Sequence, residues 1–298
     1  MLWIFLAISA HFFWALQNIG DKYILGNKIK NPYVYLVWFS LTGIFVLVVI
    51  PFISLDLPSG SIWLWLILAS AVYFYGGMPY VKAMQIEEPT RINVWWNLIP
   101  LFSLLIGWSL FDEKFTVLQL VAFAVLLTGA VIASIHARGK KIVFSKAVWY
   151  MVVSSLCFAV YGVLFHHIMN SISFLSGFVC THLFMSGFAT TLLLSKGFRR
   201  DFVRESKSLN KYLLIVILLI TLVGHLGALF NQWALSFSSA ALVFAMEGSQ
   251  VIFVFVMATL ISFFAPKILK EELDKRNMLL KLVAIVLMIA GILVLVLN

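Results

Sequence analysis

The sequence contains few charged residues. Only 11% of its 298 residues are Asp, Glu, Lys or Arg, whereas 63% are hydrophobic. Soluble domains of this size carry about 25% charged and about 45–50% apolar residues. The shortage of charge therefore excludes an ordinary soluble enzyme and a disordered chain. The two cysteines, Cys157 and Cys180, both lie in apolar runs, which excludes a disulfide-stabilised secreted domain and a Cys-x-x-Cys metal site.

Long apolar runs are what the sequence has in abundance. A helix needs about 20 apolar residues to cross the hydrocarbon core of a bilayer. Runs of that length are continuous here, whereas the strands of a membrane barrel alternate over about 10 residues. We therefore predict an all-α polytopic membrane protein with ten transmembrane helices. The spans are expected near residues 2–21, 33–52, 62–82, 92–111, 116–136, 147–168, 174–194, 212–232, 240–264 and 279–297.

The basic residues predict the orientation of these spans. Twenty of the 21 Lys and Arg fall in odd-numbered loops, and only Lys114 falls in an even one. Positively charged loops stay in the cytoplasm, so both termini are expected outside a plasma or inner membrane. The net charge is +9. Clusters such as residues 196–211 are better explained by contacts with anionic membrane lipids than by nucleic-acid binding.

Weak internal similarity relates residues 1–146 to residues 147–298. Matching positions in the same order are Trp14 and Phe158, Ala83 and Ala234, Leu120-Val121-Ala122 and Leu282-Val283-Ala284, and Gly129 and Gly291. Each part would contain five spans, and an odd number of spans makes the two parts cross the membrane in opposite directions. Inverted five-helix repeats are typical of secondary transporters, whose binding site lies near the midplane between the repeats.

The segment from Ala83 to Gly129 resembles the EamA family of the drug/metabolite transporter (DMT) superfamily. It contains that family's alanine, its Pro100-Leu101-Phe102 run, its acidic-Glu-basic turn at Asp112-Glu113-Lys114 and its late glycine. The second half departs from the pattern, with Val251 where a proline is expected. The resemblance implies two five-helix halves, export of a small amphipathic metabolite or drug-like solute by alternating access, and a pocket between spans 1, 3, 4, 6, 8 and 9. It also implies cytoplasmic termini, opposite to the orientation that the basic loops predict.

Glu247 is the one acidic residue placed well inside a predicted span. A carboxylate in the membrane interior is unfavourable unless it is paired or hydrated, and burial disfavours its charged form. Two interpretations follow: a proton-coupling residue that faces a cavity, or a neutral hydrogen-bonding group between helices. We favour the first, because ionisable residues inside membrane spans usually serve function.

A polar and aromatic stripe on the first span and a helix break on the fourth accompany Glu247. On the first span, His11, Trp14 and Asn18 share one helical face. On the fourth span, Pro100 is expected to free the carbonyl of Trp96 and to break the helix. Helix packing through hydrogen bonds is the alternative for each of these residues. The predicted substrate-binding set is His11, Trp14, Asn18, Tyr75, Asn93, Trp96, Asn97, Tyr161, His225, Gln232, Glu247 and Gln250.

Motifs for other activities are missing from the sequence. It has no phosphate-binding loop of the Walker type, no credible Ser/His/Asp arrangement and no His-Glu-x-x-His pair. We therefore expect no enzyme activity, no cofactor and no metal. The expected partners are a small-molecule solute and membrane lipids, and self-association into a homo-oligomer stays open. The alternatives are a non-transporting membrane scaffold or receptor and, less favoured, an intramembrane enzyme.

Overall fold

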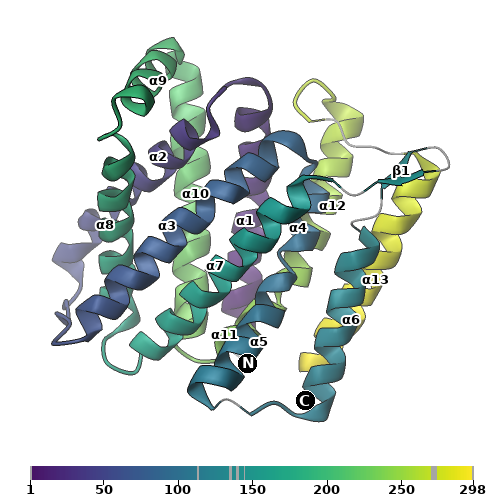
Figure 1. Ribbon diagram of the computed structural model, residues 1–298, viewed down its shortest axis with the longest axis horizontal. Helices are drawn as coiled ribbons and strands as arrows, with labels where there is room; N and C mark the ends of the chain where they lie inside the picture. Colours follow the sequence, from purple (N-terminus) through teal and green to yellow (C-terminus); the bar gives the residue numbers. More distant parts are fainter. Residues whose placement is uncertain are drawn as a thin grey trace.

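The computed structural model describes residues 2–112, 114–133, 136–138, 141–143, 145–269 and 274–296. Over these residues, nine helical segments are long and apolar enough to cross a membrane, and a shorter apolar helix covers Val117–Gly129. The helices stand side by side in one bundle (Figure 1). The predicted all-α polytopic membrane fold is therefore confirmed.

The first five spans consist of seven helices. They are α1 (Leu2–Asn27), α2 (Pro32–Thr42) continued by the 3-10 helix η1 (Gly43–Phe52), α3 (Ile62–Ile86), α4 (Pro89–Trp95) followed by α5 (Leu98–Phe111), and α6 (Val117–Ala133). Most ends agree with the predicted spans within a few residues. The first span is the exception, because α1 continues beyond the predicted end at residue 21 by almost two turns.

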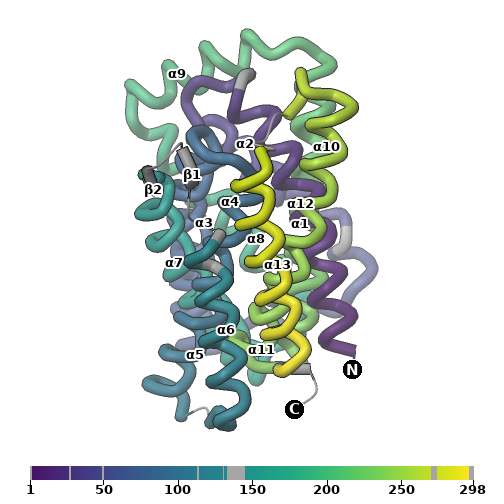
Figure 2. Tube along the Cα trace, turned by 90° about the vertical axis from the view of Figure 1, so that its right-hand side faces the viewer, coloured from purple at the N-terminus to yellow at the C-terminus, as the bar shows by residue number. Residues whose placement is uncertain are grey.

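The second five spans follow the same order. They are α7 (Ala147–Ile168), α8 (Phe174–Leu192), α10 (Lys211–Leu235), α11 (Ala240–Ala245) followed by α12 (Glu247–Phe264), and α13 (Lys275–Val296). Both ends of the chain lie at one end of the bundle, and α9 (Lys196–Ser208) lies at the other (Figure 2). That arrangement agrees with an even number of membrane crossings.

The helix α9 and a short hairpin were not predicted. The hairpin pairs β1 (His136–Arg138) with β2 (Lys141–Val143) in antiparallel register, with Ala137 opposite Ile142. Helix α9 is too short and too charged to register as an apolar run. It is attached to α2 through Phe202, which stacks on Trp38 at 5.9 Å between ring centroids. The Glu205 carboxylate also accepts the Lys30 N–H at 3.0 Å.

Two of the spans are interrupted at corresponding places. Between α4 and α5 the N–H of Asn97 bonds to the Val94 carbonyl, and between α11 and α12 the N–H of Met246 bonds to the Val243 carbonyl. Both interruptions are thus single turns of 3-10 type. The expectation that the Trp96 carbonyl is left without a partner is wrong, because it accepts the N–H of Ile99 at 2.8 Å. The break itself was predicted correctly.

The helix pairs that pack most closely are related by exchange of the two halves of the chain. Helix α1 packs on α10 and α3 packs on α7, while α2 packs on α8 and α6 packs on α13. Exchanging the spans of the first half for those of the second converts the α1–α10 pair into the α7–α3 pair. The same exchange leaves the α2–α8 and α6–α13 pairs unchanged.

The α6–α13 contact shows this relation in atomic detail. A Cβ atom placed on Gly129 of α6 would lie 3.2 Å from the carbonyl oxygen of Ala284 on α13. A Cβ placed on Gly291 of α13 would lie 3.2 Å from the carbonyl oxygen of Ala122 on α6. Both contacts are tighter than ordinary Cβ contacts, so glycine at these positions lets the two backbones approach closely without displacement. The four residues are those that the sequence comparison of the two halves had paired.

Candidate functional site

A cavity of about 80 Å³ lies inside the bundle. Such a volume admits several water molecules but no drug-sized solute, so a solute requires the surrounding helices to move. The lining residues are Trp14, Gln17, Asn18 and Asp21 of α1, Tyr35, Leu36 and Phe39 of α2, Tyr73, Gly77, Tyr80 and Val81 of α3, Trp96 and Ile99 of the fourth span, Phe158 of α7, Met185 of α8, Phe244 of α11, and Glu247 and Gln250 of α12.

The lining includes five of the predicted residues: Trp14, Asn18, Trp96, Glu247 and Gln250. Spans 1, 3, 4, 6 and 9 contribute to it as predicted. Span 8 does not, whereas spans 2 and 7 contribute side chains that the sequence did not suggest. The side chains that these two spans contribute are apolar or aromatic, namely Tyr35, Leu36 and Phe39 of α2 and Met185 of α8, so no charged or amide group marked their inner faces.

A continuous hydrogen-bonded network lies behind and along the cavity wall. The ring nitrogen Nδ1 of His11 donates to Gln250 Oε1 at 2.9 Å, because an amide oxygen only accepts. Gln250 Nε2 donates to Asn93 Oδ1 at 2.6 Å, and Asn18 Nδ2 donates to the same oxygen at 2.8 Å. The network therefore connects α1, α4 and α12 across the two halves, with Asn93 at its centre.

Glu247 stands at the first position of α12, directly after the interruption of the ninth span. It is 2% exposed, and its Oε2 atom has no hydrogen-bond partner among the described residues. The nearest basic group is His11, whose Nδ1 lies 3.5 Å from that oxygen. The Nδ1 proton points to Gln250 at the shorter distance of 2.9 Å, so the Glu247 carboxyl is available to the cavity.

Asp21 is a second buried acid of the cavity, and the sequence pattern did not predict it. We expected eleven of the twelve acids at span ends or in loops, but α1 continues past Asp21 and the residue is fully buried. Tyr35 donates its hydroxyl to Oδ1, and Gln17 Nε2 donates to Oδ2 at 3.2 Å. One signal could have found it, since Asp21 extends the stripe of His11, Trp14 and Asn18 by one helical turn.

Tyr80 connects Asp21 to the rest of the network. Its hydroxyl lies 2.6 Å from both Asp21 Oδ2 and Asn18 Oδ1. A hydroxyl carries one proton, so it donates to one of the two oxygens at a time. Through Tyr80 and Asn18 the chain of hydrogen bonds continues from Asp21 to Gln250, one turn from Glu247.

Aromatic rings form a large part of the cavity wall. The Tyr80 and Trp96 ring centroids are 5.2 Å apart, those of Trp96 and Phe158 are 5.0 Å apart, and those of Phe158 and Tyr73 are 5.1 Å apart. These separations are typical of edge-to-face and offset aromatic pairs. One aromatic surface therefore runs from α3 across the break of the fourth span to α7.

Three other predicted residues contact partners behind this wall. Gln232 Nε2 donates to the Tyr161 hydroxyl at 2.5 Å, and the Tyr161 ring stacks on Tyr73 at 4.4 Å. Asn97 Nδ2 donates to the Val94 carbonyl of its own span at 3.1 Å. For these residues the structure favours the packing interpretation.

Two more predicted residues lie away from the cavity. Tyr75 is 42% exposed, and its hydroxyl meets Thr191 Oγ1 of α8 at 3.2 Å. His225 bonds to Thr42 Oγ1 at 3.0 Å and lies 5.0 Å from the ring of His182. This cluster connects α2, α8 and α10. Among the described residues, no group of three or more His, Cys, Asp and Glu is arranged to hold a metal ion.

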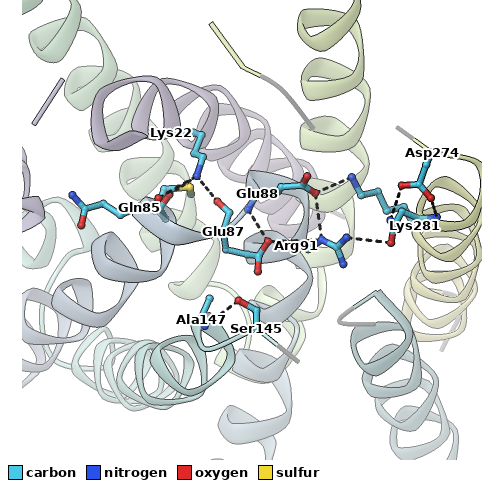
Figure 3. Close-up of polar contacts among 11 residues, drawn as sticks. Lys22, Gln85, Glu87, Glu88, Arg91, Ser145, Ala147, Asp274 and Lys281 are labelled. Carbon is cyan, nitrogen blue, oxygen red and sulfur yellow. Dashed lines mark hydrogen bonds and ion pairs between the residues drawn. The ribbon is translucent and has the colours of Figure 1, made fainter. Parts of the chain in front are cut away.

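A network of charged residues lies at the α9 end of the bundle (Figure 3). Glu88 Oε2 lies 3.3 Å from Arg91 Nε and 3.2 Å from Lys281 Nζ of α13. Lys22 Nζ of α1 donates to the carbonyl oxygens of Met84 at 2.9 Å and Glu87 at 2.6 Å. These contacts, which we call the ion network, hold α1, α13 and the junction of α3 and α4 together.

Asn277 extends the ion network to the chain segment before α13. Its Oδ1 accepts from the Arg91 guanidinium at 3.3 Å, and its Nδ2 donates to Asp274 Oδ1 at 2.6 Å. Hydrogen bonds from the side chain and backbone of Asn277 lower the pKa of the Asp274 carboxyl from its ordinary value. Asp274 therefore remains an acceptor over the whole physiological pH range.

A bundle of membrane-spanning helices around an internal cavity, lined by aromatic rings and two acidic side chains, defines a multi-pass membrane protein. Residues 1–135, slightly less than half of the chain, match the model of the EamA-like transporter family, which belongs to the DMT superfamily. The resemblance noted in the sequence is thereby confirmed.

Comparison with solved structures extends the similarity to the whole chain. A structure described only as "Crystal structure of protein" has a TM-score of 0.61 and 12% sequence identity to this chain, over 96% of this chain and 94% of the other. At that identity the likeness shows the fold alone. None of the curated protein sequences matches the chain.

Proposed function

We propose that the protein is a secondary-active transporter that exports small amphipathic solutes across the plasma membrane through the central cavity. The observation that carries this proposal is the position of Glu247. Its carboxyl oxygen lies buried, without a hydrogen-bond partner in the described structure, at the break of a membrane span. Interrupted spans at corresponding places of two halves are the usual location of transporter binding sites.

Alternating access would come from movement of residues 1–146 against residues 147–298, as two inverted five-helix repeats. The exchange symmetry of the helix pairs supports this, as does the reciprocal approach of Gly129 and Gly291. In this conformation the ion network connects Glu88, the residue before α4 in the first half, to Lys281 of α13 in the second half. Access to the cavity from the α9 end would require these contacts to separate.

Glu247 would couple transport to protons. A buried carboxyl favours its neutral form, and a solute that interacts with the charged form would displace the proton. In the described residues, the only titratable group close to it from a neighbouring helix is His11 of α1, at 3.5 Å. A non-transporting scaffold would need no such exchange of a proton for a solute.

Modification of a cysteine in place of Trp96 tests the site. The background is Cys157→Ala with Cys180→Ala, which removes the natural thiols. In proteoliposomes, we expect a small polar thiol reagent to label Trp96→Cys and to block solute flux, and a transported solute to protect the thiol. Asn97→Cys is the matched control, since Asn97 follows Trp96 in the sequence but its side chain does not line the cavity. Equal labelling of both, without protection, would show that the solute binds elsewhere.

Reporter tags at the two termini test the orientation. The basic loops predict that both tags are accessible from outside the cell, and the structure places both ends of the chain on one side of the bundle. Accessibility would be measured with an impermeant protease on intact cells. Two protected tags would favour the orientation implied by the family resemblance, and tags on opposite sides would contradict the ten-span fold.

A further inference from the structure

The cavity carries acidic groups without basic ones. Asp21 from α1 and Glu247 from α12 line it, and no Lys, Arg or His of the described chain does. Lys22 follows Asp21 in sequence but donates to the Met84 and Glu87 carbonyls at the end of α3. His11 stands behind Glu247 and donates its Nδ1 proton to Gln250. Neither acid therefore has a full positive charge from the protein beside it in the cavity.

Asp21 retains room for a further partner. An ionised carboxylate has about four acceptor positions. Tyr35, Gln17 and Tyr80 occupy at most three of them. These donors favour the charged carboxylate, whereas burial disfavours it. A positive charge brought into the cavity would shift that balance toward the ionised form, because a buried charge is stable when it is paired.

The aromatic wall suits the same kind of ligand. Trp14, Tyr73, Trp96 and Phe158 all face the cavity. Ring faces attract cations by about 0.5–2 kcal/mol each, and most strongly where water is excluded. The two acidic groups and the aromatic rings that line the same cavity would together hold a cation whose remaining surface is apolar. An anionic solute would meet two acidic groups and no compensating base.

We propose that the cavity selects small aromatic cations, with the Asp21 carboxylate as the group that recognises the positive charge. This inference rests on the proposed function and specifies its substrate class. Glu247 would serve as the second acidic group, which gives up its proton to solvent when the cation enters. Binding then adds one positive charge with the cation and removes one with the proton, so the net charge of the site does not change.

Binding of three probes of similar size tests the selection. They are phenyltrimethylammonium, benzenesulfonate and benzyl alcohol, which are cationic, anionic and neutral. We expect isothermal titration calorimetry on the purified protein to detect the cation and to show at least about tenfold weaker binding of the other two. A tenfold difference corresponds to about 1.4 kcal/mol, well within the attraction of two charges about 4 Å apart in a protein interior.

Asp21→Asn should weaken binding of the cation at least about tenfold, which again is about 1.4 kcal/mol. Asparagine keeps the shape and still accepts from Tyr35, so the fold should persist, as a thermal melt would verify. Asp21→Glu retains the charge and should retain the preference for the cation. Asp201→Asn is the matched control, because Asp201 lies on α9 beside Arg204, outside the cavity, and its loss should leave binding unchanged.

Three outcomes would overturn the inference: no binding of the cation, equal binding of the anion or the alcohol, or unchanged binding of the cation by Asp21→Asn. Flux into proteoliposomes separates this inference from the proposed function. If an anionic or neutral solute is transported, and if modification of Trp96→Cys blocks that transport, cation selection is refuted. The proposed transport through the cavity would then still hold. Selective, Asp21-dependent binding of the cation without any flux would support cation recognition and refute transport.

Discussion

Replacing Glu247 with glutamine is expected to remove most of the pH dependence of solute binding. In the wild-type protein the proton and the solute compete for the site, so binding should tighten as the pH rises, by at most about tenfold per pH unit for one proton. Glutamine preserves the size and hydrogen-bonding capacity but is neutral at every pH. Binding to the Glu247→Gln variant, measured by calorimetry between about pH 5 and pH 9, should therefore vary much less with pH than binding to the wild-type protein, and the remaining dependence would come from Asp21.

The control for this experiment is Glu247→Asp, which keeps a titratable carboxyl and should keep a pH-dependent affinity. Glu247→Ala should be more harmful than Glu247→Gln, because it also removes a polar group from a buried site. An unchanged pH profile in Glu247→Gln would contradict proton coupling through this residue. Coupling would then have to involve Asp21 or His11, the other titratable groups of the same network.

Asn93→Ala is expected to lower the stability of the protein strongly. The Asn93 side chain is fully buried, and its Oδ1 accepts from both Asn18 and Gln250. Alanine would leave both donors without an acceptor, at about 1–3 kcal/mol for each buried group. The loss should appear as a lower midpoint in thermal denaturation of the purified protein, and as weaker attachment of α1 and α12 to α4.

Asn97→Ala is the matched control for Asn93→Ala, since it lies one turn further along the same span. Its Nδ2 atom donates to the Val94 carbonyl, and its Oδ1 has no partner within the described residues. Its replacement strands no donor of another helix, and the expected loss is below about 1.5 kcal/mol. Equal destabilisation by the two substitutions would show that the interhelical network contributes nothing beyond local helix contacts.

The helix ends could be predicted because the thickness of the bilayer sets the length of each apolar run, and basic residues mark the loops between runs. The site was harder to predict. Helical spacing correctly placed Trp14 and Asn18 on the inner face of α1. It could not show that α1 continues two turns past its apolar segment, and Asp21 was therefore assigned to the span end. Tyr75 was predicted to bind substrate, but it faces outward, and the glycines that follow it, Gly76 and Gly77, pack against Cys157 and Leu36.

Helices α6 and α13 pack chiefly on each other, at the edge of the bundle. Their inner contact uses the backbone at Gly129 and Gly291, and their outer faces expose apolar side chains such as Val117 and Val286. Segments that share few contacts with the rest of a protein open as separate cooperative units, below the free energy of global unfolding. The backbone amides of these two helices should therefore exchange with deuterium together, before those of α1 and α7 around the cavity.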